Sequence, residues 1–516
     1  MITTPESIFS LSPALYALLG ALISYYGLER AWAGALRIYP FLGILALLLF
    51  LIALFRVLGD LPAACRPNPR SRRGFQRVCR AVTVLAVGFT LGFAARNAAA
   101  AGDLRLTLPP ERVLGITGTL LDDPRGTASG GMGYLRLEAA SASGGLRASA
   151  RGRLMVFFPP EAIPRLKEFG RSSGVYLEGS LRESPSGAGA AGGQVPRFSA
   201  KSVHILREAS ALEQLRTVVR MRLLDQFAGR PWGALAAALI LGAREDQSPE
   251  AVALAGAFKA AGCSHVLALS GMHLAIVSAL IAFLLKRPLG LKPAALAGAF
   301  CIILYVYLVG PQPSLVRAAI MYLLGTAAIL GAFPRQPLPL LALAFLIQIA
   351  ADPLSGDTLS FILSYLALGG ILIAGEALGD LFRGLIPPAI AQPLVASLGA
   401  FIATAGISAA AFGVLRPVGI GASFVIVPLS TCFMIAAIAY LGASFLLPPL
   451  GGLLSSLLSL LYRILEETAA LAARVPALEL RRPLVVSLLS VVLVIALVWF
   501  QARHKAWRER LLPFDG

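Results

Sequence analysis

The chain has 516 residues, of which 57% are hydrophobic and only 14% charged, and its formal net charge is +18. Soluble domains average about 25% charged residues, so this composition excludes an ordinary soluble protein and predicts a polytopic membrane protein. Membrane proteins gather Lys and Arg in their cytoplasmic loops. This topology accounts for most of the positive charge, so the charge need not indicate binding to nucleic acid.

The first 100 residues form an N-terminal membrane region with three apolar segments, at about residues 9–27, 39–58 and 81–97. Between the second and third lies the loop 59–80, which carries six arginines against one acidic residue. The positive-inside rule places this loop in the cytoplasm, together with the N-terminus. Residues 103–208 are then extracytoplasmic.

Residues 103–208 contain no long apolar run and are rich in Gly and Ser. Alternating stretches between glycine-rich turns predict a small all-β domain, either an OB-like barrel or a sandwich, with a flexible loop around residues 184–196. The strands are expected near 113–121, 134–137, 154–158, 175–181 and 202–206. An OB-like barrel can bind a single nucleic-acid strand through cations and stacking aromatics.

Six aromatic side chains could serve that binding, although we expect about four of them to pack in the β core. They are Tyr134, Phe157, Phe158, Phe169, Tyr176 and Phe198. The candidate strand contacts are Tyr134, Phe157 and Tyr176.

Residues 209–262 connect the β domain to the membrane core. Helical periodicity over 209–230, with Arg216 and Arg220 four residues apart, predicts an interfacial helix. Two apolar pieces follow, at 232–243 and 249–262. Both are too short to cross a bilayer comfortably. We therefore expect each to be a re-entrant helix, an interfacial helix or a helix packed inside the bundle.

Nine further apolar segments follow from residue 264 onward and bring the expected total to about twelve membrane spans. Residues 263–447 form the membrane core, and 448–516 form C-terminal segments with a basic cytoplasmic tail. The chain is predicted to lie in the cytoplasmic (inner) membrane with both termini inside. The nine segments lie at about 264–285, 292–309, 313–331, 337–351, 358–375, 390–413, 418–447, 449–465 and 484–500.

Glycine and proline interrupt several core segments, including Pro428 within 418–447. Broken helices expose backbone groups that need protein or water partners, which favours a pathway. Arg317 lies about one turn into a span, with Ser314 on the same helical face. It either snorkels to the interface or faces the bundle interior. An interior guanidinium suits a polyanion, because Arg binds phosphate oxygens in pairs.

His265, Ser270 and His273 stand at the start of an apolar run, where polar groups are costly. Ser270 and His273 share a helical face, so they could form a serine-hydrolase dyad, or they could line a pore and join helices. The sequence contains no Gly-x-Ser-x-Gly elbow, metal-ligand motif or phosphate-binding loop. It therefore predicts no enzyme activity, no metal and no cofactor.

Residues 232–447 resemble the ComEC family of competence proteins, and residues 103–208 fall where that family has an OB-like domain. The resemblance rests on short blocks of sequence: Ala237 to Gly242, Phe258 to Gly262, His265 to His273, Ser314-Leu-Val-Arg317-Ala-Ala-Ile-Met, Asp352-Pro353, Phe361-Ile-Leu-Ser364, Ala403-Thr404, Phe412-Gly413 and Ser423 to Pro428.

The resemblance implies a membrane channel that passes single-stranded DNA into the cytoplasm during natural transformation. The family pattern has polar or proline residues where this chain has Ile362, Phe401, Gly406 and Ser423. That departure leaves open a transporter of another polyanion or of an envelope precursor. The implied translocation core comprises His265, Ser270, Gly271, His273, Ser314, Arg317, Ser364 and Pro428.

Many relatives also carry a metallo-β-lactamase-like nuclease domain, for which this sequence has no metal-binding histidines. The expected partners are therefore single-stranded DNA, membrane lipid, a separate nuclease, an extracytoplasmic DNA receptor and a cytoplasmic helicase or motor.

Overall fold

The computed structural model describes residues 12–27 and 69–479, apart from 103, 128–129, 143–145, 183–196, 244–248, 268, 270, 383–384 and 447, together with isolated residues between 485 and 496. The expected span 39–58, the loop around 184–196 and most of 484–500 lie outside the described residues. The chain divides into two compact units, one of residues 1–102 and 320–358, the other of 103–319 and 359–516.

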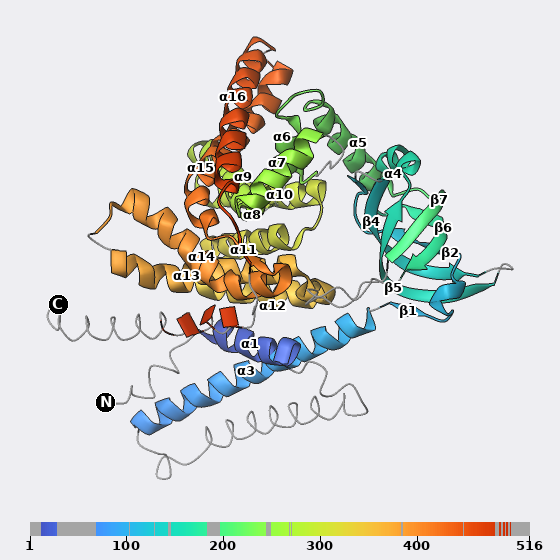
Figure 1. Cartoon of the computed structure of the whole chain (residues 1–516). Coiled ribbons are helices and arrows are strands. Elements are labelled where there is room, and N and C mark those ends of the chain that lie inside the picture. Colours follow the sequence, from blue (N-terminus) through green and yellow to red (C-terminus); the bar gives the residue numbers. More distant parts are fainter. Residues whose placement is uncertain are drawn as a thin grey trace. The chain divides into compact units, whose positions relative to one another are not determined.

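The first unit is built on two packed helices, α1 (Pro13–Leu22) and α3 (Pro69–Ala101) (Figure 1). Glycine allows their close approach, since a Cβ on Gly88 would lie 1.9 Å from the Ala17 carbonyl oxygen. After α1, the π-helix η2 (Ile23–Gly27) contributes Tyr25, whose hydroxyl donates to the Pro353 carbonyl at 2.6 Å. This bond ties η2 to the 3-10 helix η6 (Pro353–Asp357), which follows α12 (Pro337–Ala351).

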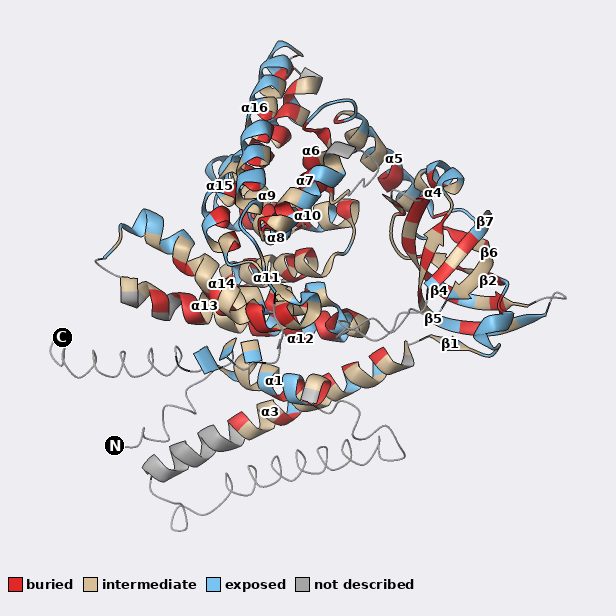
Figure 2. Ribbon diagram, viewed as in Figure 1, coloured by how far each residue is buried: buried red, intermediate tan, exposed pale blue. Residues whose placement is uncertain are grey.

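The second unit begins with the β domain, and four of its strands run longer than the alternating stretches that predicted them. Figure 2 shows buried residues alternating with intermediate or exposed ones along the longer strands, as expected for strands with one face on a core. Short helices η4 (Pro110–Arg112), η5 (Pro160–Ala162) and α4 (Ile163–Phe169) connect them. The strands are β1 (Arg105–Leu106), β2 (Gly115–Leu120), β3 (Arg125–Thr127), β4 (Gly130–Ser141), β5 (Arg147–Phe158), β6 (Gly174–Arg182) and β7 (Arg197–Arg207).

Five of these strands close into a ring. β2 pairs with β4 and β6, β4 pairs with β5, and β6 pairs with β7, all antiparallel. The ring closes through a parallel pairing of β5 with β7, in which Val156 lies opposite Phe198. Both side chains are buried, with Leu135 and Leu154, in the apolar centre of the domain. The expectation of a separate β domain is confirmed.

Asp122, in the turn after β2, gives this domain a pH dependence. Partial burial raises the pKa of its carboxyl to about 6, although its Oδ1 accepts the Tyr134 N–H at 2.8 Å. The folded domain therefore binds a proton between about pH 4 and 6 that the unfolded chain releases, so stability falls as pH rises through that window. We expect Asp122→Asn, which keeps the acceptor, to flatten this fall in thermal-unfolding curves taken at pH 4–7. An unchanged pH profile in the variant would contradict this assignment.

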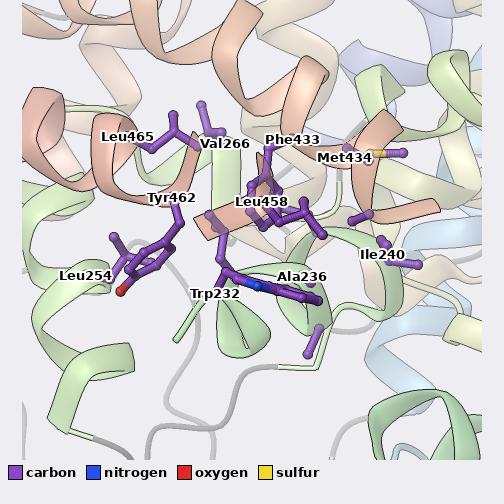
Figure 3. Packing of buried hydrophobic residues seen from close by; sticks show 14 of the residues in the cluster. Trp232, Ala236, Ile240, Leu254, Val266, Phe433, Met434, Leu458, Tyr462 and Leu465 are labelled. Carbon is purple, nitrogen blue, oxygen red and sulfur yellow. The ribbon is translucent and has the colours of Figure 1, made fainter. Parts of the chain in front are cut away.

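The rest of the second unit is helical, and its largest buried cluster surrounds Trp232 (Figure 3). Phe433, Leu458 and Tyr462 pack there with Leu254, so segments far apart in sequence share one core. The elements are α5 (Ala211–Asp225), α6 (Gly233–Leu241), α7 (Pro249–Ala260), α8 (Ser264–Leu267), α9 (Gly271–Leu289), α10 (Leu291–Val309), the first residues of α11 (Pro313–Leu330), α13 (Leu359–Phe382), α14 (Pro388–Phe412), β8 (Val414–Leu415), α15 (Val418–Leu446), α16 (Pro448–Ala473) and β9 (Leu478–Glu479).

Six helices of the described chain are long and apolar enough to cross a membrane. Shorter apolar helices occupy 13–26, 251–260, 337–351 and 359–375. The expected segment 449–465 lies in α16, which is not among the six. A membrane protein is confirmed, and the count of twelve spans stays a prediction. The six are Ala81–Ala100, Gly271–Leu289, Leu291–Val309, Pro313–Leu330, Pro388–Phe412 and Val418–Ser444.

Candidate functional site

One outward face of the barrel combines arginines with aromatic side chains. Successive residues of a strand point to opposite faces, so the residues that alternate with the buried positions of β4 and β5 point outward. Arg136 of β4 lies opposite Arg153 of β5. In the next row, Tyr134 lies opposite Met155, which is paired with Arg197 of β7. We call these residues, with Phe157, the β4–β5–β7 face.

Positive charge accumulates on the strands of the β domain at a cost. Like charges directly opposite each other destabilise a sheet, yet three pairs of arginines are cross-strand partners in this domain. The pairs are Arg136–Arg153, Arg105–Arg151 and Arg182–Arg197.

The three candidate strand contacts of the sequence do not lie together. Tyr134 and Phe157 are diagonal neighbours, because Phe157 lies two residues beyond the partner of Tyr134. Tyr176 stands on β6 and stacks on His204 of β7, with ring centroids 6.3 Å apart. Among the other aromatics only Phe158 and Phe198 are buried, so fewer of the six pack in the core than expected.

Helix α5 covers the segment predicted as an interfacial helix, which stays a prediction, and its Arg216 is buried. Its side chain is 1% exposed and pairs with Asp123 of the β domain, with Nη2 2.6 Å from Oδ2. Arg220 lies 3.4 Å from the same carboxylate oxygen. Burial raises the pKa of Asp123, but these two guanidinium groups outweigh it and hold the pKa below its ordinary value.

A second ion pair stands beside the first. Arg171, in the turn after α4, meets Glu213 of α5 through Nε at 2.9 Å and Nη2 at 3.0 Å. Arg171 and Arg216 both donate to the Tyr307 carbonyl near the end of α10. We call Asp123, Arg171, Glu213, Arg216 and Arg220 the ion-pair cluster. It joins the barrel, α5 and α10.

Arg317, on the first turns of α11, is a buried cation of the helical core. The residue is 7% exposed, and its Nη1 donates to the Ser364 carbonyl of α13. The guanidinium carbon lies 5.8 Å from the centre of the Tyr365 ring, a cation–π contact. Within the described residues, its Nε has no hydrogen-bond partner and no carboxylate forms an ion pair with it.

Gly271, the first residue of α9, lies against this guanidinium. A Cβ built on Gly271 would stand 3.0 Å from Arg317 Nη2. Ser314, one turn before Arg317, donates its hydroxyl to the Leu269 carbonyl at 2.5 Å. Gly271, Ser314, Arg317 and Ser364 are therefore brought together from three separate stretches of sequence.

The remaining predicted core residues are more scattered. His273 is buried on the first turn of α9, at 1% exposed. His265 is exposed on the short helix α8, and Pro428 is exposed within α15. Ser270 lies outside the described residues, so the geometry of the proposed Ser270–His273 dyad stays a prediction.

Sequence reasoning missed three groups of residues. Tyr365 follows the quoted Ser364 directly, and its place under Arg317 becomes visible only when α11 meets α13. The ion-pair cluster joins Asp123 to Arg216 across 93 positions. The third group is the arginines of the β4–β5–β7 face. The alternation of Arg151 and Arg153 in the sequence could have indicated this group, since alternate residues of a strand point to the same side.

The described helices and the separate β domain define a polytopic membrane protein that carries a folded β domain. A family model described as "Competence protein" matches residues 239–505, more than half of the 516-residue chain. The chain therefore belongs to the competence protein family, as its ComEC-type sequence blocks indicated. This family is of channel type rather than a family of enzymes, and it gives the chain a role in competence and DNA uptake. No curated protein and no solved structure matches the chain.

Proposed function

We propose that this protein conducts single-stranded DNA across the cytoplasmic membrane, and that the β4–β5–β7 face receives the strand. The observation that carries the proposal is the row of arginines beside Tyr134 and Phe157 on that face. Phosphates need cations, and the flat faces of unstacked bases need aromatic rings, so a single strand matches both features.

The strand pairing supports an OB-fold for the β domain. In barrel order the five strands read β2, β4, β5, β7, β6, with β5 and β7 parallel and α4 between β5 and β6. OB-folds bind oligonucleotides on the face of their second and third strands. Those strands are β4 and β5 here, which carry Tyr134, Arg136, Arg153 and Phe157.

The same proposal includes an orientation in the membrane and a set of partner proteins. The β domain faces the outside of the cytoplasmic membrane, and both termini face the cytoplasm. An extracytoplasmic receptor delivers the DNA, a separate nuclease removes one strand, and a cytoplasmic helicase or motor draws in the other.

The double variant Arg136→Gln, Arg153→Gln tests the proposal. Each arginine that neutralises a phosphate of a single strand adds about 0.7 to the slope of log affinity against log salt, so losing two lowers the slope by about 1.4. Binding of a fluorescent oligothymidylate to the purified full chain, measured by anisotropy at several NaCl concentrations, gives this slope.

The matched control is Arg112→Gln, Arg165→Gln, which removes the same charge from exposed positions on η4 and α4, away from the face. We expect its salt slope to equal that of the parent. Equal losses in the two double variants would mean that net charge alone attracts the strand, and the proposed face would be wrong.

A further inference from the structure

We propose that helix α5 docks on the lipid surface of the membrane through an apolar stripe along one side, and that it holds the barrel at that surface. The two arginines that indicated an interfacial helix in the sequence lie on a different side of α5. The inference goes beyond the proposed function and does not depend on DNA. The apolar stripe consists of Leu212, Leu215, Val218 and Val219.

The polarity of α5 is the reverse of that of an ordinary amphipathic helix, which buries its apolar side and exposes its charges. Three of its charged residues, Glu213, Arg216 and Arg220, belong to the ion-pair cluster and face protein. Its apolar stripe is exposed instead. The exposed fractions are 64% for Leu212, 62% for Leu215, 48% for Val218 and 39% for Val219.

The spacing of these four side chains makes the apolar stripe continuous. Residues three and four positions apart lie on the same side of a helix. Leu215 follows Leu212 by three positions, and Val218 and Val219 follow Leu215 by three and four. An exposed apolar surface of this kind marks a contact with a membrane or with another protein.

The contact of α5 with α10 places the apolar stripe at the level of the membrane surface. α10 is one of the helices able to span the membrane, so its last residues lie near an edge of the hydrocarbon layer. Arg216 Nε donates to the Tyr307 carbonyl at 2.9 Å, and Arg220 Nη1 donates to the Val309 carbonyl at 3.4 Å. α5, which leads from the barrel to the helical core (Figure 1), therefore lies at the end of a span.

The surface of α10 indicates which apolar medium α5 meets. Phe300, Ile303 and Leu304 of α10 are 68%, 54% and 55% exposed, as expected for side chains that face lipid along a span. Because α5 contacts the end of this helix, the lipid around α10 adjoins α5. A helix at that level can bury its apolar side at the boundary between headgroups and acyl chains.

The charges of α5 predict that this docking does not need anionic lipid. Interfacial helices are usually rich in Lys and Arg, which attract anionic headgroups. On α5 the exposed charged residues are Arg222 and Asp225, which follow the apolar stripe and have opposite signs. The apolar area alone is left to attach the helix, so attachment should be equal in neutral and anionic membranes and at low and high salt.

The test uses the purified full chain in phosphatidylcholine nanodiscs that contain a phospholipid with a diazirine in its acyl chain. After irradiation, mass spectrometry locates the carbene adducts. We expect adducts at Leu212 and Leu215, as at Phe300 of α10. Leu146, which is 68% exposed between β4 and β5, controls for exposure. A water-soluble diazirine should label it, but the lipid should not.

A double variant tests whether the apolar stripe itself attaches the helix. Leu212→Gln, Leu215→Gln should lower the adducts at Val218 and Val219 about tenfold, the factor by which burial of one leucine side chain shifts a partition equilibrium. The matched control is Leu114→Gln, Leu146→Gln, at exposed positions of the β domain, which should label as the parent does. All four positions are exposed, so the thermal-unfolding midpoints in detergent should stay near that of the parent.

Three results would overturn the inference. Adducts on Phe300 with none on α5 would show that protein or water covers the apolar stripe. A yield on α5 that rises with phosphatidylglycerol, or falls with NaCl, would show that charge rather than apolar area attaches the helix. Equal labelling of Leu146 and Leu212 by the lipid would show that the reagent reports exposure alone. A failure of the barrel to bind an oligonucleotide would remove the proposed function and leave this inference standing.

Discussion

Asp123→Ala is expected to lower the free energy of unfolding by about 3–5 kcal/mol, the usual cost of removing one partner of a buried ion pair. The variant leaves the Arg216 side chain, which is 1% exposed, without the carboxylate that accepts its two Nη hydrogen bonds. Arg220 loses the same partner. Chemical denaturation of the purified full chain in detergent, followed by far-UV circular dichroism, measures the loss.

The control for this prediction is Asp225→Ala, which removes an exposed carboxylate from the end of α5. Substitutions at such positions change stability by about 0.5 kcal/mol or less. A double-mutant cycle with Arg216→Ala isolates the pair, since both changes together should cost less than the sum of the two single changes. Strict additivity would contradict a direct pairing.

Gly370→Ala is expected to destabilise the α13–α14 pair by about 1–3 kcal/mol, the typical cost of overpacking a tight contact. A Cβ at Gly370 would stand 2.3 Å from the Gly399 carbonyl oxygen of α14, and backbone atoms cannot rotate away from it. Small residues let helices of membrane proteins approach in this way. Thermal unfolding of the purified protein measures the effect.

The adjacent glycine supplies the comparison. Gly369→Ala adds a Cβ that meets nothing within 4 Å, and alanine is favoured over glycine inside a helix by about 1 kcal/mol. It should therefore leave stability unchanged or raise it. If the two neighbouring variants behaved alike, helix propensity rather than packing would explain both, and the proposed contact would be wrong.

Local patterns predicted the parts of the fold that depend on local physics. The low share of charged residues indicated the membrane class, and alternation around Leu135 and Leu154 indicated strands. Hydropathy placed apolar helices at positions such as 292–309, where α10 lies. Each of these signals needs only neighbouring residues, because burial of one face or of a whole helix imposes a short period.

Contacts between distant segments could not be predicted in this way. The parallel pairing of β5 with β7 depends on how the barrel closes, and no short-range pattern encodes the partner of Asp123. Arg216 and Arg220 look like an exposed basic stripe until the β domain supplies a carboxylate. Tyr365 illustrates the same limit, since its ring faces Arg317 only after α11 and α13 have packed.

The ion-pair cluster also decides how a mechanical load would travel through the second unit. Arg216 and Arg220 donate to the carbonyls of Tyr307 and Val309, the final residues of α10. α11 begins four residues after Val309, at Pro313, and carries Arg317 on its first turns. If a strand pulls on the barrel as the proposed function requires, the load would pass through these bonds to the corner between α10 and α11, so the β domain would be mechanically coupled to the helix that carries the buried guanidinium.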